Sequence, residues 1–297
     1  MDVNTHNNDN VSVQSNDEAL TKQQLKKDIM KTSLALAAFI ITVNLLAVII
    51  SSVSIAFNSD IQSMMMQYFT SGKSYNDIIN DPVYLNAVTE ATGAIMGPSM
   101  IISSIAAVFW LMTIRGKNLF GSDLKTANEK VSISVILKIF VLVMGVQFIS
   151  TVITIGLNPL LDKVNLSLTD ALEMGMGALF STPWGILAGV LIVPVIEEIV
   201  FRGAILRKLQ PYGLNFAIVM SSLLFALYHM ILLQAFFAFF IGLLLAYAAT
   251  RFSLKWSVLI HVLNNSYLTV KKYLILYQAA KRKSLIRSAP RLHSLCF

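Results

Sequence analysis

The chain has 297 residues, of which 56% are hydrophobic and only 13% are charged, and its formal net charge is +7. About a quarter of the residues in a soluble domain are charged, so this composition excludes an ordinary water-soluble protein. The single cysteine, Cys296, excludes an internal disulfide and a cysteine-based metal cage, and without a basic stripe interleaved with aromatic residues we expect no nucleic-acid partner.

The first 31 residues form a polar N-terminal segment, which we expect to lie in the cytoplasm. Residues 1–20 are rich in Asn, Asp and Ser and are expected to be disordered. Residues 21–31 contain four lysines and are expected to form a short helix at the membrane surface. The lysines precede the first apolar run, which favours a cytoplasmic N-terminus by the positive-inside rule. No cleavable signal peptide is expected, because the apolar run starts only after this polar segment.

Long apolar runs without Asp, Glu, Lys or Arg follow, and each is long enough to suggest a membrane span. The longest run is expected to hold two spans that meet near residues 231–234. The sequence therefore predicts an all-α fold, a polytopic transmembrane helical bundle with about seven spans and a range of six to eight. The uncharged runs are 33–57, 93–114, 139–157, 174–196, 209–250 and 256–270.

The charges between these runs alternate in sign. Segment 58–90 holds one base against four acids, and segment 158–173 holds one base against three acids, so both are expected outside. Segment 115–130 is basic, as are the ends near Arg207 and Arg251, and these are expected inside.

The alternation fails at the basic C-terminal tail, residues 271–297. The preceding span should exit outside, where a basic segment is not expected. Either residues 273–280 turn back as part of a poor eighth span, or the tail is a variation or a truncated final helix.

Adjacent glutamates interrupt the apolar pattern of the fourth run, and ionisable residues inside a membrane are functional candidates by default. Glu198 and Arg202 stand four residues apart, in the favourable order for an ion pair on one helix face. Glu197 points about 100° away and has no such partner on its helix, so it is the carboxylate available for chemistry.

Two histidines lie in later runs. His229 stands four residues after Phe225, and His261 stands four residues before Asn265, so each pair shares a helix face. The rise of a helix places these groups within a band of about 13 Å, a gap that helix tilt could close, which makes a shared polar cavity open to the cytoplasmic side feasible. Measured from the inner boundaries, the depths are roughly 15 Å for Glu197, 22 Å for His229, 9 Å for His261 and 15 Å for Asn265.

A carboxylate and an imidazole together can orient and deprotonate a water molecule for attack on a carbonyl carbon. A second imidazole and an amide can donate hydrogen bonds to the oxyanion that develops. The set Glu197, His229, His261 and Asn265 supplies these groups, and we interpret it as the candidate catalytic set.

Each residue also has a structural interpretation. Glu197 and Glu198 suit the interfacial end of a span. His229 alone is more often a hydrogen-bond partner between packed helices, and Asn264 and Asn265 are also typical of interhelical contacts. For each residue taken alone, the structural interpretation remains open. The interpretation that all of them are structural is less favoured.

Two other features concern helix packing. Ala238, Gly242 and Ala246 have the small-xxx-small spacing of closely packed membrane helices. Pro194 precedes the glutamates and is expected to bend the fourth span, which would free backbone carbonyls near the site.

Three motifs in this order resemble those of one family: Glu197-Glu198-x-x-x-Arg202, Phe225-x-x-x-His229 and His261-x-x-x-Asn265. The family is the CPBP family of CAAX-protease and bacteriocin-processing membrane endopeptidases, also called the Abi family and related to the type II CAAX prenyl endopeptidase. The resemblance covers approximately residues 130–267. It implies an α-helical membrane bundle with a conical cavity open to the cytoplasm.

The resemblance also implies roles. Glu197 would activate water with help from His229, while His261 and Asn265 would stabilise the oxyanion. The glutamate and arginine of the predicted ion pair would be supporting residues.

Family members have been described both as metal-dependent and as glutamate-type peptidases. A zinc set would consist of Glu197, His229 and His261. These residues lie on three predicted helices and lack the i,i+4 histidine pair of the zincins, so we favour metal-free water activation and no cofactor. Zinc remains the alternative.

The predicted function is an intramembrane endopeptidase that cuts a peptide or lipid-modified protein near the membrane surface, in peptide maturation, CAAX-type processing or bacteriocin self-immunity. The alternative is a non-catalytic membrane immunity or scaffold protein that binds a transporter or toxin peptide. A proton-relay transporter is disfavoured, because inverted repeats are not evident.

The chain is predicted to be an integral, multi-pass membrane protein, located in the plasma membrane if the source is bacterial. No oligomeric state is predicted. The expected organisation is the polar segment 1–31, two transmembrane helices with loops in 32–129, the catalytic membrane domain 130–270 and the tail 271–297.

Overall fold

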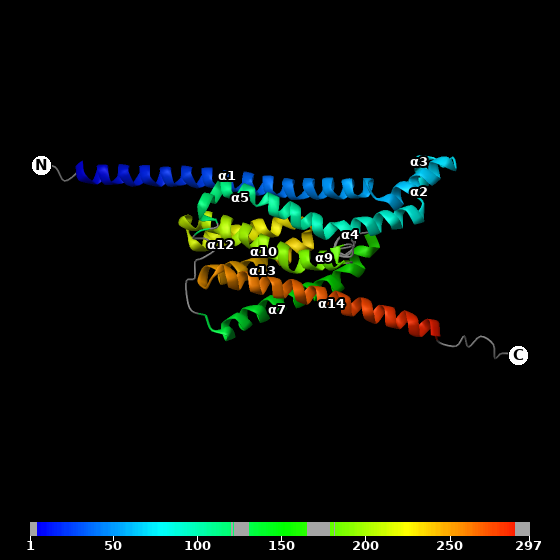
Figure 1. Ribbon diagram of the computed structural model, residues 1–297. Helices are drawn as coiled ribbons and strands as arrows, with labels where there is room; N and C mark the ends of the chain where they lie inside the picture. The colour runs from blue at the N-terminus through cyan, green and yellow to red at the C-terminus, as the bar shows by residue number, and fades with distance from the viewer. Residues whose placement is uncertain (1–4, 120, 122–130, 165–178, 181, 289–297) are drawn as a thin grey trace.

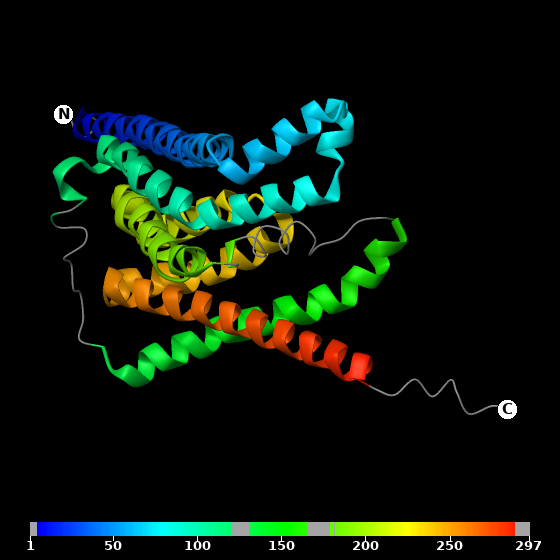
Figure 2. The ribbon, with the colours of Figure 1, turned by 45° about the vertical axis from the view of Figure 1, so that its right-hand side comes forward.

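A computed structural model describes residues 5–119, 121, 131–164, 179–180 and 182–288, and every regular element in these ranges is a helix. The predicted all-α fold class is confirmed. Figures 1 and 2 show the helices in layers: α1 (Thr5–Ala56) and α4 (Pro82–Ala107) lie on one face of the bundle, α7 (Ile133–Leu161) and α14 (Leu254–Ser288) lie on the opposite face, and segment 183–251 lies between them.

The first face is built on α1 (Thr5–Ala56) and α4 (Pro82–Ala107), which pack along each other. α2 (Ser59–Thr70) and α3 (Tyr75–Ile79) connect them at one end of the bundle, and α4 continues into α5 (Phe109–Arg115). The predicted outer segment 58–90 is therefore mostly helical.

The central rod consists of consecutive helical segments with changes in hydrogen-bond register. α9 (Pro183–Leu187) leads into the π-helical segment η3 (Ala188–Ile192), then α10 (Val193–Glu198). A second π-helical segment, η4 (Ile199–Leu206), and α11 (Arg207–Leu209) complete the rod. π-type segments are rare and occur frequently at functional sites.

Four further helices complete the bundle. α12 (Leu214–Tyr228) and α13 (Leu232–Arg251) form a hairpin, in which α12 packs on η4 of the central rod. α14 (Leu254–Ser288) packs on α10 and α13, and α7 (Ile133–Leu161) packs on α13 and α14. The remaining short helices are η1 (Gly116–Asn118), η2 (Asp162–Val164) and η5 (Gln210–Tyr212).

In the described residues, seven helical rods correspond in position to the apolar runs that predicted about seven spans. In the described residues, five helices are long and apolar enough to cross a membrane: Thr21–Ala56, Pro82–Asn118, Ile133–Leu161, Pro183–Tyr212 and Leu232–Arg251. The other two rods are α12, which is apolar but has only 15 residues, and α14, which has 35 residues and a basic second half.

Several predicted boundaries were wrong. α1 is helical from Thr5, although residues 1–20 were expected to be disordered. An existing helix gains one hydrogen bond for each residue added, so the helix that forms in the apolar run can extend into the polar segment before it. α14 continues to Ser288, so residues 273–280 do not turn back, and only the last part of the predicted tail, 289–297, lies outside the described residues.

The fourth span also differs from its predicted range of 174–196. Its first residues, 174–178, lie outside the described residues, and the helix of the central rod begins at Pro183. The Thr182 side chain caps this helix by accepting a hydrogen bond from the Gly185 backbone N–H at 3.1 Å. Proline at the first helical position has a backbone angle already suited to a helix, which explains the start.

One end of the bundle joins segments that we predicted to lie on the same, inner side. The Asp28 carboxylate of α1 contacts Lys208 Nζ at 2.9 Å and accepts a hydrogen bond from the Tyr212 hydroxyl at 2.8 Å. Arg207 donates to the Ala249 carbonyl near the end of α13 at 3.3 Å. These contacts place the three segments at one end, while the assignment of that end to the cytoplasm stays a prediction.

α4 and α9 cross at two glycines with almost no space between their backbones. A Cβ atom added to Gly97 would lie 2.5 Å from both the Gly185 nitrogen and the Trp184 carbonyl carbon. Only the absence of a side chain permits such an approach.

Gly97→Ala is therefore expected to lower the free energy of unfolding by about 1–3 kcal/mol, because the backbones must separate. The measurement is the thermal unfolding midpoint in detergent. Gly145→Ala is the matched control, since a Cβ at this position on α7 meets no atom within 4 Å. If the two variants unfold at the same temperature, the crossing is not a tight packing point.

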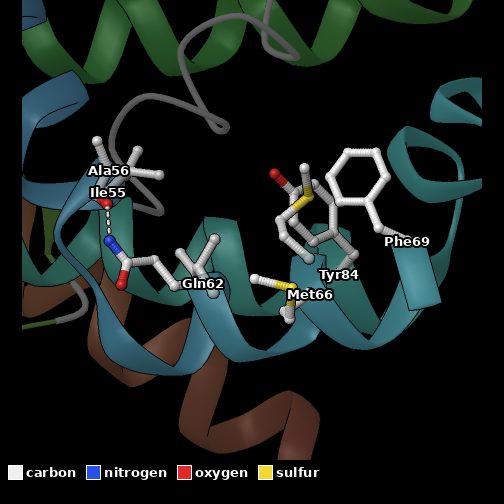
Figure 3. A pocket seen from close by; sticks show the side chains of 8 residues that line it. Ile55, Ala56, Gln62, Met66, Phe69 and Tyr84 are labelled. Carbon is white, nitrogen blue, oxygen red and sulfur yellow. Dashed lines mark hydrogen bonds between the residues drawn. The ribbon is translucent and has the colours of Figure 1, made fainter.

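An apolar groove of about 420 Å³ lies between α1, α2 and α4, at the C-terminal end of α1. Figure 3 shows the side chains that line it. None of the candidate catalytic residues is among them, so this groove is separate from the predicted site. The lining residues are Ile55, Ala56, Ile61, Gln62, Met65, Met66, Phe69 and Tyr84.

Candidate active site

The carboxylates of the site are carried by α10, between the two π-helical segments. The backbone N–H of Val193 donates to the Ala188 carbonyl, five residues back. In the same register the next acceptor is the Gly189 carbonyl, but the residue five positions later is Pro194, which has no N–H. Pro194 therefore leaves the Gly189 carbonyl without its helical donor, as the sequence led us to expect for a carbonyl near the site.

Glu198 and Arg202 form the predicted ion pair. Arg202 Nη1 lies 2.8 Å from Glu198 Oε1, and neither side chain is exposed to solvent. Arg202 Nη2 also donates to the Gly242 carbonyl at 3.2 Å, and the guanidinium carbon lies 4.4 Å from the centre of the Phe225 ring. The Ser257 hydroxyl donates to the other Glu198 oxygen. The buried charges are thus paired and hydrogen-bonded, as burial of a charge requires.

His261 of α14 lies between the two glutamates. Its Nδ1 atom is 2.9 Å from Glu198 Oε1, and its Nε2 atom is 3.6 Å from Glu197 Oε2. An ionised carboxylate only accepts hydrogen bonds, so Nδ1 carries the proton and Nε2 faces Glu197. The sequence had indicated no partner for Glu197 on its own helix, and the structure supplies one from a different helix.

Asn265 lies one turn after His261 on α14. Its Nδ2 atom donates to the Gly189 carbonyl of η3 at 3.0 Å, and its Oδ1 atom accepts a hydrogen bond from Asn264 at 3.2 Å. Asn265 is therefore held against the carbonyl that Pro194 leaves free.

His229 follows the last residue of α12. Its Nδ1 atom lies 2.8 Å from the Phe225 carbonyl, which can only accept, so Nδ1 carries a proton. The Phe225 ring contacts both histidine rings edge-on, with ring centres 4.7 Å from His229 and 5.7 Å from His261. Within the described part of the chain, no hydrogen bond or ion pair joins His229 to Glu197. The structure thus brings His261 into direct contact with the glutamates, and His229 only through an aromatic ring.

The break after α12 lies where two spans were predicted to meet. Met230 has a positive backbone φ angle of 57°, and α13 begins at Leu232. The left-handed conformation costs a residue with a side chain roughly 1–2 kcal/mol. Strained residues of this kind cluster at functional sites, and here the strained residue directly follows His229.

The three residues of the alternative zinc set are not gathered into one group in this structure. In the ranges that the structure describes, no group of three or more His, Cys, Asp or Glu side chains is placed to hold a metal ion. Glu197 and His261 approach each other, but within the described residues no hydrogen bond or ion pair joins His229 to either of them.

Two contributors to the site were missed from the sequence. Ser257 stands four residues before His261 and contacts the same glutamate, so the spacing that identified the other pairs would have found it. Gly242 was interpreted as a packing residue. It does pack closely, since an added Cβ would lie 3.1 Å from Ser222 Cβ, but its carbonyl also binds Arg202.

Comparison with known proteins identifies one part of the chain. Residues 179–267 match the family model described as type II CAAX prenyl endopeptidase Rce1-like. No curated protein and no solved structure matches the chain. The matched segment runs from just before α9 into α14 and contains all seven residues of the three motifs.

Proposed function

We propose that this membrane protein, which belongs through residues 179–267 to the type II CAAX prenyl endopeptidase Rce1-like family, hydrolyses a peptide bond near the membrane surface with a water molecule activated by Glu197. The resemblance inferred from the motifs is thereby confirmed at the level of the family, which is one of membrane peptidases. The observation that carries the proposal is the position of Glu197: it is almost fully buried, adjacent to a fully paired glutamate, and faces the Nε2 atom of His261.

In the proposed reaction, Glu197 takes a proton from water while the water oxygen attacks the carbonyl carbon of the scissile bond. The electron pair of the C=O bond moves onto the oxygen. When the intermediate collapses, the C–N bond breaks and the leaving amine takes the proton from Glu197. His229, whose Nδ1 proton is bound by a backbone carbonyl, presents Nε2 as an acceptor that assists in holding the water.

The oxyanion would receive hydrogen bonds from His261 and Asn265. Glu198 supports this role, because it fixes the His261 ring through Nδ1 and leaves Nε2 for the reacting groups. Because Nδ1 already donates to Glu198, a hydrogen bond from Nε2 to the oxyanion requires the ring to carry a proton on both nitrogens.

The proposed substrates are peptides or lipid-modified proteins that reach the site from the end of the bundle that holds Asp28, which we assign to the cytoplasmic side. Prenylated CAAX termini are favoured by the family description, and peptide maturation or bacteriocin self-immunity would use the same chemistry on an unmodified peptide. We propose water activation without a metal ion.

The test is cleavage of two reporter peptides by the purified full-length chain in nanodiscs: a farnesylated CAAX peptide and the same peptide without the lipid. We expect cleavage of at least one peptide, at the same rate with a zinc chelator and with its non-chelating isomer. If the chelator abolishes cleavage and its non-chelating isomer does not, the mechanism depends on a metal ion and Glu197 alone does not activate the water. Absence of cleavage of both peptides and of a peptide library would favour the non-catalytic binding protein.

A further inference from the structure

Three side-chain amides form a continuous row of hydrogen bonds across the bundle, from α7 through α14 to η3. Gln147 Nε2 donates to Asn264 Oδ1 at 3.0 Å, and Asn264 Nδ2 donates to Asn265 Oδ1 at 3.2 Å. Asn265 Nδ2 then donates to the Gly189 carbonyl at 3.0 Å. Gln147 lies 117 residues from Asn264 and belongs to none of the three motifs.

The Gly189 carbonyl fixes the direction of the whole row. An amide group has a donating and an accepting end, whereas a backbone carbonyl only accepts. Asn265 must therefore turn its NH₂ group toward Gly189 and its oxygen toward Asn264. Asn264 must then donate to Asn265 and accept from Gln147, so each amide has one orientation that satisfies all the bonds.

Pro194 is the reason that this carbonyl is open to a side chain. In the π register of η3 the carbonyl of Gly189 would accept from residue 194, and proline has no hydrogen to give. The Asn265 amide takes the place of the missing backbone donor. The helix defect and the orientation of Asn265 are thus two parts of one arrangement.

We infer that Gln147 and Asn264 are positioning residues that hold the Asn265 amide with its NH₂ group toward the site. This inference rests on the proposed function, in which Asn265 donates to the oxyanion. An NH₂ group carries two hydrogens, and the Gly189 carbonyl binds one of them. The second hydrogen is available to the reacting carbonyl only while the amide keeps this orientation, which the Gly189 carbonyl selects and the bonds to Asn264 and Gln147 help to hold.

The surroundings of Gln147 favour this role over that of a solvated surface residue. α7 is an apolar helix whose residues are mostly exposed to the outside of the bundle, and an amide in a membrane is costly unless it is hydrogen-bonded. Asn264, its partner, is only 4% exposed. Thr151, one turn along α7, makes a different contact to α14, in which its hydroxyl accepts a hydrogen bond from Lys271 at 3.1 Å.

The first experiment compares Gln147→Met with Thr151→Val in the peptide cleavage assay. Methionine keeps the length of the side chain but cannot donate, so the Asn264 oxygen loses its donor and Asn265 is held less firmly in the orientation that Gly189 sets. We expect Gln147→Met to lower kcat about three- to tenfold, as for one lost hydrogen bond, with KM changed less than twofold. Thr151→Val removes a polar contact between the same two helices and is expected to leave kcat unchanged. Equal kcat values for Gln147→Met and Thr151→Val, or for Gln147→Met and the wild type, would overturn the inference.

A second readout does not depend on cleavage. Among the described residues no hydrogen bond joins Gln147 directly to Asn265, so their effects on the thermal midpoint should add unless the row couples them. We expect the drop caused by Gln147→Met to be smaller in an Asn265→Ala background, where the row has already lost its anchor. If the wild-type chain cleaves nothing, the proposed function fails while this coupling can still be measured. Additive changes in the midpoint would show that the row does not couple Gln147 to Asn265 and would overturn the inference.

Discussion

Glu197→Gln is expected to lower the rate of peptide cleavage by about a hundred- to ten-thousandfold, the range for removal of a general base. Glutamine has nearly the shape of glutamate but cannot take a proton from water. The structure predicts little change in the fold, because the nearest charged contact of Glu197 is the 3.6 Å approach of His261. The measurement combines initial cleavage rates with the thermal midpoint of the same protein preparation.

The matched control is Glu90→Gln, the same chemical change at an exposed position of α4. It is expected to cleave at the wild-type rate. Retention of wild-type cleavage by Glu197→Gln would contradict the assignment of the base. A second outcome is that the wild type cleaves no peptide and Glu197→Gln keeps every binding or resistance phenotype of the wild type. In that case the hypothesis of a non-catalytic scaffold protein would replace that of a peptidase.

Arg202→Met is expected to lower the free energy of unfolding by about 3–5 kcal/mol, the cost of leaving a buried charge without its partner. The Glu198 carboxylate is fully buried and would keep only the contacts from His261 and Ser257. The same change removes the donor to the Gly242 carbonyl. Unfolding in detergent, followed by loss of helical circular dichroism, measures the effect.

The double variant Glu198→Gln/Arg202→Met tests whether Arg202→Met loses stability through the unpaired charge or through lost packing. It leaves no unpaired charge in the bundle, so we expect it to be more stable than Arg202→Met alone. A double variant that loses as much stability as both single variants combined would mean that the two residues act independently.

Much of the fold and part of the site follow from local rules that the sequence carries. Uncharged runs predicted the helical rods, since a bilayer allows few other structures. The spacing of Glu198 and Arg202 predicted their ion pair, because residues four apart share a helix face. Pro194 predicted a freed carbonyl, because proline lacks the N–H that a helix uses.

Contacts between helices could not be predicted in the same way. The partner of Glu197 is His261, on another helix, and helix periodicity says which residues share a face but not which faces meet. The depth estimates treated each helix as an independent straight rod, so they gave no means to see that His229 turns Nδ1 to its own backbone. The acceptor of Asn265 depends on a π register, which changes the partner of a carbonyl by one residue.

The buried ion pair has an electrical consequence. A single elementary charge that crosses the whole membrane field gains or loses about 2.3 kcal/mol per 100 mV. Glu198 and Arg202 carry opposite charges whose nearest atoms are 2.8 Å apart, so the work that the field does on one nearly cancels the work that it does on the other. An energised membrane therefore exerts almost no net force on the core of the site, and the stability of this core should be the same whether the cell's membrane potential is high or has collapsed.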